Sequence, residues 1–191
     1  NVVDHVDFDV RRGEIVCIAG IDGNGQSELV EAIVGTLKLQ GGQVRLNGED
    51  LTGASVLKRQ EAGISHVSED RMRYGSAPKL SLEDNAISKV YYTGQLKSRG
   101  LIDSKKVNGF ANRILKEFLV KYDNSKQSVS ELSGGNVQKL IVGREFDYDP
   151  DLLIMNQPTR GIDVGSKAEI YEIMNQLVLQ GVSIIMISSE L

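Results

Sequence analysis

The stretch 20–29 (GIDGNGQSEL) holds the residues with the clearest potential for chemistry. Glycines let a backbone turn tightly, so that successive N–H groups can point inward at an anion. A helix that begins at such a turn adds unpaired N–H groups and the positive end of its dipole. These residue types predict a phosphate-binding loop, provided that a strand leads into it and a helix leads out.

The loop departs from the usual phosphate-binding pattern at one position. The spacing G-x-x-x-x-G-K-[ST] is met at Gly20, Gly25 and Ser27, but Gln26 occupies the place of the phosphate-contacting lysine. The stretch can therefore be a working nucleotide site, an altered one, or a tight strand-to-helix turn that binds nothing.

Two later motifs carry polar groups at predicted element ends. The segment 132–136 (LSGGN) offers a hydroxyl and paired glycines at a helix start, and 152–163 (LLIMNQPTRGID) is an apolar strand that ends in polar residues. Taken singly, the first can be an ordinary N-cap, because Ser and Gly are favoured there. The second can be any exit from a strand.

The elements that must position these motifs alternate between strands and helices. We expect a buried strand at 15–19 and a helix at 27–35 around the glycine loop, with a turn at 11–14 before them. The other expected strands are 2–10, 43–48 (which meets an Asn-Gly turn), 64–67, 152–155 and 182–187, and the other expected helices are 55–62, 82–92, 104–122, 137–146 and 166–180. This alternation predicts an α/β fold with a mainly parallel sheet covered on both faces and an antiparallel part near the N-terminus.

Residues 81–128 differ from the rest of the chain in that helical patterns replace strand patterns. We expect a helical subdomain there, and a core formed by 1–80 and 129–191. Asp103 or Ser104 can cap its second helix, and Asp163 or Ser166 can cap the helix at 166–180. The apolar stripe of the second helix consists of Val107, Phe110, Ile114, Leu115, Phe118 and Leu119.

The composition is that of an ordinary globular domain. Of the 191 residues, 40% are hydrophobic and 25% charged, which excludes a disordered or fibrous chain. The lone Cys17 excludes a disulfide framework and fits a reducing compartment. A net charge of −4 argues against nucleic acid as the main partner. We expect a fragment of a longer protein, because Asn1 lacks a lead-in and Leu191 follows a strand where a helix should close the unit.

The order and separation of the three motifs resemble those of the ATP-binding-cassette (ABC) ATPases, over essentially the whole chain. The resemblance implies the P-loop NTPase fold, with a helical insertion ahead of LSGGN. Details at 20–28, 68–71 (SEDR) and 158–165 (PTRGIDVG) look like the second, C-terminal cassette of the tandem ATPases that drive bacterial simple-sugar and nucleoside importers. The Asn-Gln-Pro-Thr form leans toward the nucleoside or basic-lipoprotein-linked branch.

The resemblance implies that ATP is held by the glycine loop and Mg²⁺ by Ser27. The loop residues carried over are Gly20, Asp22, Gly23, Asn24, Gly25, Gln26, Ser27 and Glu28. Five positions depart from the family pattern together: Gln26 replaces the loop lysine, Asn156 the metal-supporting aspartate, Gln157 the glutamate that polarises water, Glu69 the magnesium-sensing glutamine, and Ser189 the histidine after the last strand. No aromatic residue that would stack on adenine is identifiable.

Phosphoryl transfer depends on charge neutralisation and a positioned nucleophile, and losing one charge-stabilising group costs on the order of 10²–10³ in rate. We therefore expect this loop to hold ATP weakly, with weak or absent Mg²⁺, and not to hydrolyse it. An alternative is that Gln26 and Gln157 were introduced to trap ATP, but Asn156, Glu69 and Ser189 would then need separate explanations.

The LSGGN segment is intact, and in this family it closes over ATP held by a second cassette. The resemblance implies that Ser133, Gly134 and Gly135 act in trans on that site and that Asp163 helps to position it. The expected partners of this chain are a second cassette, N-terminal in the same full-length chain, and integral membrane permease subunits. An extracytoplasmic substrate-binding protein is an indirect partner, and no nucleic acid is expected. The expected location is the cytoplasmic face of the bacterial cell membrane, as a peripheral protein.

Two further readings stay open. A non-catalytic regulatory or scaffolding cassette would bind ATP without turnover, and a soluble cassette of DNA repair or translation fits less well because the chain lacks a basic face. The segment 69–80 would lie toward the membrane subunits, although the charged run 70–73 can also be simply solvated.

Overall fold

The structure is a computed structural model that describes residues 3–189. The first residue of the expected strand at 2–10, and the chain ends on which we based the fragment reading, lie outside the described residues. The chain divides into two compact units. The first comprises the residues up to 66, 149–158 and those from 174 onward; the second comprises 67–148 and 159–173.

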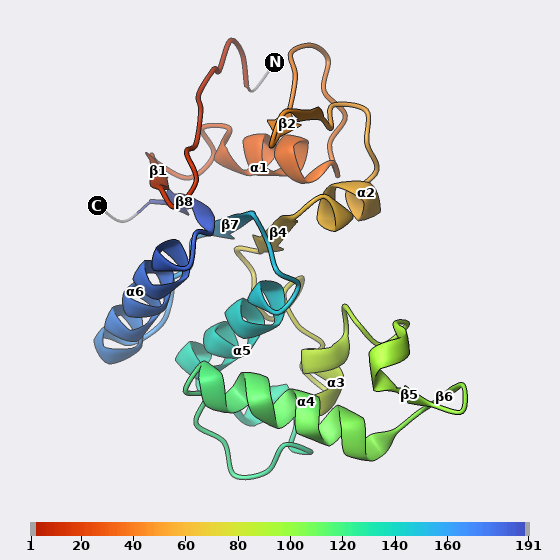
Figure 1. Ribbon diagram of the computed structural model, residues 1–191. Helices are drawn as coiled ribbons and strands as arrows, with labels where there is room; N and C mark the ends of the chain where they lie inside the picture. Colours follow the sequence, from red (N-terminus) through yellow and green to blue (C-terminus); the bar gives the residue numbers. More distant parts are fainter. Residues whose placement is uncertain (1–2, 190–191) are drawn as a thin grey trace. The chain divides into compact units, whose positions relative to one another are not determined.

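A four-stranded sheet forms the centre of the first unit, in the order β1-β8-β7-β4 (Figure 1). The strands are β1 (Ile15–Ala19), β8 (Ser183–Ser188), β7 (Leu152–Asn156) and β4 (Ile64–Val67), the last of which runs to the boundary of the unit. β8 pairs in parallel with both β1 and β7, so that Met186 stands between Cys17 and Met155. The prediction of a mainly parallel sheet is confirmed.

The two strands beside β8 differ in burial. All of β7 is buried, whereas alternate residues of β1 are exposed, Cys17 among them. The expectation of a fully buried first strand is therefore wrong. Because the exposed residues alternate along the strand, one face of β1 is open among the described residues.

The helix α1 (Gln26–Val34) covers the sheet next to the glycine loop. Its Val30 and Ile33 pack in one apolar cluster with Ile154 of β7 and Ile185 of β8. The C-terminal end of α1 is held by the buried Arg59, whose Nη1 donates to the carbonyls of Ala32 and Ile33 at 2.6 Å each. Arg59 lies in α2 (Val56–Glu61), within the helix expected at 55–62, and Ser55 is the N-cap of this helix.

The antiparallel part of the first unit is small. β2 (Arg45–Leu46) and β3 (Glu49–Asp50) form a hairpin whose turn, Asn47-Gly48, has φ of 51° and 84°. Two positive φ values in succession are what a two-residue hairpin turn requires, so the Asn-Gly signal was read correctly. The strand expected at 2–10 is absent from the described residues 3–10, where Val6 and Phe8 are exposed. Alternation alone was insufficient, because a strand needs a partner for its backbone groups.

The second unit is mainly helical. α3 (Leu82–Ile87), α4 (Ser104–Glu117) and α5 (Gly134–Phe146) contact one another pairwise (Figure 1). Asp103 caps α4, as one of the two expected candidates. Most of the expected stripe of α4 is buried, but Leu119 is exposed, because the helix ends at Glu117 and Leu119 takes a left-handed conformation with φ of 53°.

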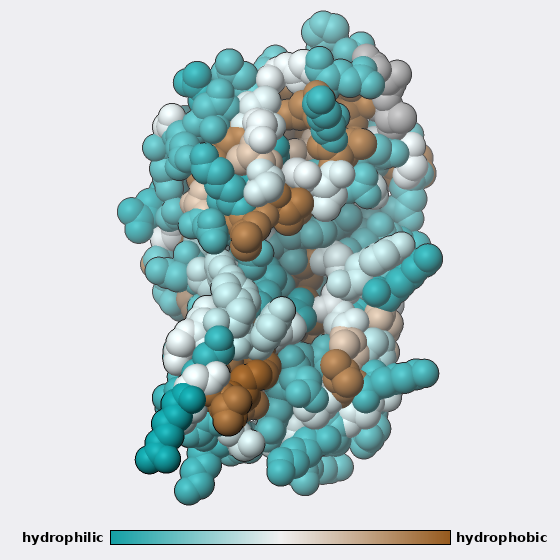
Figure 2. All heavy atoms as spheres, turned by 90° about the vertical axis from the view of Figure 1, so that its right-hand side faces the viewer, coloured by the Kyte–Doolittle hydropathy of each residue, from teal (hydrophilic) through white to brown (hydrophobic). Residues whose placement is uncertain are grey.

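The link between α3 and α4 contains structure that the sequence did not reveal. A 3-10 turn, η1 (Gly94–Leu96), leads into a hairpin of β5 (Lys97–Ser98) and β6 (Leu101–Ile102), turned at Arg99-Gly100. A second 3-10 turn, η2 (Val129–Glu131), precedes α5. The hairpin exposes Leu101 and Ile102. Figure 2 shows that hydrophobic residues on the face drawn there form separate patches among hydrophilic ones.

The last helix, α6 (Val164–Leu179), contributes its first part to the second unit and its last part to the first. Asp163 caps its start: the Ser166 N–H donates to Asp163 Oδ1 at 2.9 Å. Within residues 3–189, none of the helices combines the length and hydropathy needed to cross a membrane.

Candidate functional site: a glycine loop and a signature face

The glycine loop joins β1 to α1 in the first unit. Gly23 and Gly25 have φ of 90° and 95°, which side chains with a Cβ rarely adopt, so glycine is required at both positions. α1 begins with Gly25 as its N-cap, without a hydrogen bond from a capping side chain. The first turn of α1 therefore leaves its N–H groups to an anion, as a phosphate loop requires.

Gln26 is folded back over the loop. Its Nε2 donates to the Ile21 carbonyl at 3.2 Å and would lie 2.3 Å from a Cβ placed on Gly20. An amide is neutral, and the segment 20–29 contains Asp22 and Glu28 but no Lys or Arg. The loop therefore offers backbone dipoles to a phosphate without the positive charge that the usual lysine supplies.

Gln157 joins three segments of the first unit. It follows β7 directly, has φ of 51°, and is 7% exposed. Its Nε2 donates to Asp22 Oδ1 at 3.1 Å, while its Oε1 accepts from the Ser189 N–H at 3.1 Å and from Ser189 Oγ at 3.2 Å. A glutamate could not make this set of bonds, because a carboxylate has no hydrogen to donate to Asp22. The structure therefore brings Gln157, Ser189 and the loop together in one hydrogen-bonded group.

The expected metal residues do not suit Mg²⁺. Asn156 is neutral and buried, and Ser27 contributes a hydroxyl that is exposed. Glu69 lies in the second unit, where it forms an ion pair with Arg160. Among residues 3–189 no group of three His, Cys, Asp or Glu is placed to hold a metal ion. Mg²⁺ is usually bound through one or two carboxylates together with substrate phosphates, whereas Asn156 offers only a neutral amide and Glu69 is paired with Arg160.

The signature face is the N-terminal end of α5 in the second unit, formed by Ser133, Gly134 and Gly135. Ser133 is the N-cap of α5 and is exposed, so its hydroxyl is accessible. Ser133 Oγ accepts from Asn136 Nδ2 at 2.9 Å, and Asn136 Oδ1 accepts from the Lys121 N–H at 2.9 Å. Asn136 thus orients the serine hydroxyl. An amide three residues after a serine N-cap was a signal for this role, by analogy with a capping box.

Gly135 packs where no side chain fits. A Cβ at this position would lie 2.1 Å from Ser166 Oγ, which donates to Asp163 Oδ2 at 2.6 Å. The hydrogen bonds from the Ser166 side chain and backbone hold the pKa of Asp163 below its ordinary value, so Asp163 is ionised at neutral pH. The structure therefore brings Asp163 and Gly135 together.

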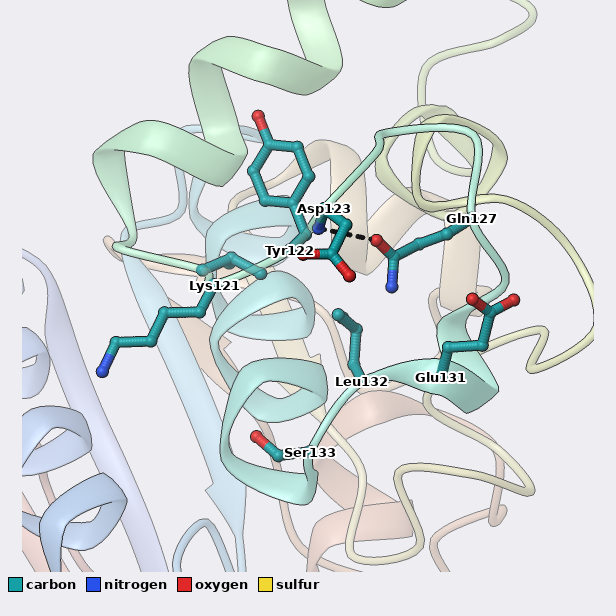
Figure 3. A pocket seen from close by; sticks show the side chains of 8 residues that line it. Lys121, Tyr122, Asp123, Gln127, Glu131, Leu132 and Ser133 are labelled. Carbon is teal, nitrogen blue, oxygen red and sulfur yellow. Dashed lines mark hydrogen bonds between the residues drawn. The ribbon is translucent and has the colours of Figure 1, made fainter.

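A polar hollow of about 430 Å³ lies beside Ser133 (Figure 3). Half of the residues that line it have charged or amide side chains: Lys121, Asp123, Gln127 and Glu131. Gln127 Oε1 accepts from the Asp123 N–H at 2.8 Å, which is the dashed line in Figure 3. The sequence did not point to this hollow, since its residues come from the irregular segment between α4 and α5.

Comparison with known proteins decides the family. The family model described as "ABC transporter" matches residues 3–160. The chain belongs to the ABC transporter family. Among curated ABC relatives, it is 43% identical over 184 residues to a nucleoside import ATP-binding protein of Lactococcus lactis, covering 96% of this chain and 36% of that protein. It is 42% identical over 189 residues to a glucose import ATP-binding protein of Haloferax volcanii, covering 98% and 34%. The chain spans about a third of the length of these relatives.

Solved ABC cassettes share the fold. A nucleotide-free ATP-binding cassette from an ABC transporter superposes with a TM-score of 0.83 at 24% identity, over 99% of this chain and 76% of that one. A dimeric cassette in a post-hydrolysis state, bound to ADP and Pi, superposes with a TM-score of 0.80 at 20% identity, over 99% and 80%. The predicted ABC ATPase fold, with a parallel sheet and separate antiparallel strands, is confirmed.

Proposed function

We propose that this ABC chain is an ATPase cassette of an importer for a simple sugar or a nucleoside, and that its two ATP-facing regions have different roles. Its own loop is a degenerate site that holds ATP weakly and does not hydrolyse it. Its signature face, Ser133–Gly135 with Asp163, completes the ATP site of a partner cassette.

The hydrogen bonding of Gln157 carries this proposal. The residue that should polarise water is an amide that donates to Asp22 and accepts from Ser189. An amide has no useful basicity, so it cannot accept a proton from attacking water. Gln26 and Asn156 also lack the charges that phosphoryl transfer needs, so three independent features of the first unit support the same conclusion.

The residues of the loop fit a phosphate but not its metal. We propose that the backbone of Gly20–Gly25 and the first turn of α1, with Gln26, Ser27 and Glu28, hold the phosphates of ATP. A magnesium ion, where bound, would supply charge neutralisation. Because Asn156 and the Arg160-paired Glu69 do not suit it, we assign no step to magnesium at this loop.

The substrate and partners are proposed from the relatives. Their names refer to nucleoside, glucose, ribose and xylose import. Because this chain spans about a third of their length, we propose that it is the second cassette of a tandem pair, which acts with membrane permease subunits at the inner face of the cell membrane. We also propose that 81–128 is its helical subdomain and that 1–80 with 129–191 is its core.

A pair of substitutions tests the proposal. In this chain assembled with a hydrolysis-competent partner cassette, Ser133→Ala is expected to lower ATP turnover by on the order of 10²-fold, since it removes a group aimed at the reacting phosphate. Gln26→Ala is expected to change turnover less than twofold. Equal losses from both substitutions would contradict the proposed division of roles.

A regulatory or scaffolding cassette is the second candidate. The proposed degenerate loop favours it, since a cassette that binds ATP without hydrolysing it can still stabilise a partner contact. It predicts wild-type turnover after Ser133→Ala. The same experiment therefore separates the two functions.

A further inference from the structure

The segment 69–71 is bonded to the loop 159–163, which carries Asp163. Asp70 forms the turn: its Oδ1 accepts from the N–H groups of Met72 and Arg73 at 3.1 and 2.9 Å. Arg71 is half-buried, whereas its neighbours Asp70 and Met72 are exposed. The guanidinium donates to two consecutive carbonyls, with Nη1 bonded to Arg160 O at 2.7 Å and Nη2 to Gly161 O at 2.9 Å.

Arg71 also lies against the signature face. A Cβ built on Gly134 would be 2.9 Å from Arg71 Nη2, so the guanidinium covers the first turn of α5. A Cβ on Gly161 would lie 3.5 Å from the same atom. One planar group therefore lies between the 160–161 backbone and the start of α5, and the Glu69–Arg160 ion pair adds a second link from the same segment. The charged run 70–73 is thus not simply solvated.

We propose that Arg71 is a positioning residue for the signature face. It fixes the loop 159–163 against α5, so that Asp163 and Ser133–Gly135 meet a partner cassette as one preassembled surface. The inference rests on the proposed function, because it assigns Arg71 to the face that acts in trans. Arg71 itself touches no reacting atom.

Arginine suits the hydrogen bonds to the carbonyls of Arg160 and Gly161. Two carbonyls on successive residues need two donors held in a fixed fork, which the planar guanidinium provides and an ammonium does not. Glycine at position 134 leaves room for this contact, since a Cβ there would force the end of the guanidinium to shift. Arg73 offers a matched comparison: it lies two residues away, carries the same charge and rests over the exposed Tyr74 ring at 5.1 Å.

The test compares Arg71→Met with Arg73→Met by hydrogen–deuterium exchange and by turnover. In this chain alone, Arg71→Met is expected to speed amide exchange about tenfold in the peptide covering 159–163, and Arg73→Met is expected to leave it unchanged. With a competent partner cassette, Arg71→Met is expected to lower kcat between about 10- and 100-fold with KM within twofold, because a misplacement of about 1 Å can cost about 10²-fold. Arg71→Lys should recover part of kcat.

Gly134→Ala is a second probe of the same contact. It should speed exchange at 159–163 in the wild-type background and add little in the Arg71→Met background. Wild-type exchange and kcat in Arg71→Met would overturn the inference, and so would a lower melting temperature with unchanged kcat. If Ser133→Ala abolishes turnover while Arg71→Met does not lower it, only the inference on Arg71 fails. If Ser133→Ala leaves turnover intact, the proposed function fails with it.

Discussion

The glycine loop and the signature face both lie at helix starts, yet they are built differently. At α1 the cap is Gly25, which has no side chain to accept a hydrogen bond. The amide of Gln26 is bonded to the Ile21 carbonyl, and that of Gln157 is bonded to Asp22 and Ser189. At α5 the cap is Ser133, whose exposed hydroxyl is oriented by Asn136. The loop has the glycine backbone of a phosphate-binding turn and no Lys or Arg in residues 20–29, whereas Ser133 of the signature face is oriented by a neighbouring amide.

The backbone shape of the loop and its charge depend on different residues. The positive φ angles of Gly23 and Gly25 preserve the turn between β1 and α1 whatever occupies position 26. The chemistry depends instead on a few side chains, and those can change while the sheet stays intact. Four further substitutions test how far the contrast extends.

The largest expected effect is at Gly135. In Gly135→Ala the new Cβ would lie 2.1 Å from Ser166 Oγ, so the start of α5 must shift away from Asp163. We expect turnover with a competent partner to fall by on the order of 10²–10³. Gly109→Ala is the matched control: a Cβ in this part of α4 meets nothing within 4 Å, so it should stabilise the chain by about 1 kcal/mol without affecting turnover.

The next largest effect is expected on stability, at the buried Glu145 in the last turn of α5. Glu145 is 1% exposed and forms ion pairs with Lys89 and Arg144. Glu145→Gln leaves both cations without their carboxylate, and we expect the free energy of unfolding to fall by about 3 kcal/mol. Urea unfolding at neutral pH measures this loss. A change below about 0.5 kcal/mol would show that the signature helix does not depend on this group.

The stability difference between wild type and Glu145→Gln should depend on pH. Burial alone raises the pKa of Glu145, but the charges of Arg144 and Lys89 outweigh it and hold the pKa below its ordinary value. A carboxyl whose folded pKa lies below its unfolded pKa stabilises the protein fully above the unfolded value. That stabilisation is lost as the pH falls through the folded pKa. The stability difference between wild type and Glu145→Gln should therefore shrink in acid.

A smaller effect is expected at Gln157. Gln157→Ala removes the side-chain hydrogen bonds to Asp22 and to the Ser189 N–H, each worth about 1 kcal/mol, whereas the exposed Ser189 hydroxyl can bond to water instead. The free energy of unfolding should therefore fall by about 2 kcal/mol. Turnover with a competent partner should stay within twofold of wild type. A large loss of turnover together with unchanged stability would mean that Gln157 acts in catalysis.

The smallest effect on turnover is expected at Gln26. Gln26→Lys returns a cation to the loop and should tighten ATP binding by this chain, because the phosphates gain a charged partner. Turnover should change less than twofold, since Asn156 and Gln157 still lack the charges needed for hydrolysis. Nucleotide titration measures the first quantity and phosphate release the second. Restored hydrolysis from this one change would refute the degenerate-site account.

Much of the fold could be predicted from local pattern. The strand at 64–67 was predicted with its observed bounds, and the residue types of the Asp103 cap and of the Asn47-Gly48 turn were enough to predict both features. The strand at 2–10 failed because alternation does not reveal whether a partner strand exists. The hairpin at 97–102 was missed because each of its strands has only two residues, too few for a period to be recognised.

The site was predictable by residue type and less so by contact. The sequence identified Gln26, Gln157 and Ser133, whose chemistry is inherent in the side chain. It could not show that Gln157 bonds to both Asp22 and Ser189, or that Arg71 bonds to the 160–161 carbonyls, because these partners lie far apart along the chain. Such contacts depend on tertiary packing, which local pattern does not encode.

The number of ATP molecules hydrolysed per pair of cassettes is the most direct test of the proposed roles of the glycine loop and the signature face. This chain, paired with a competent cassette and loaded with ATP, is followed through a single turnover, and the nucleotide that stays bound is then identified. The account predicts one ATP hydrolysed per pair, at the site that Ser133–Gly135 completes, with any ATP held by this chain's own loop recovered intact. Two ATP hydrolysed per pair would contradict it.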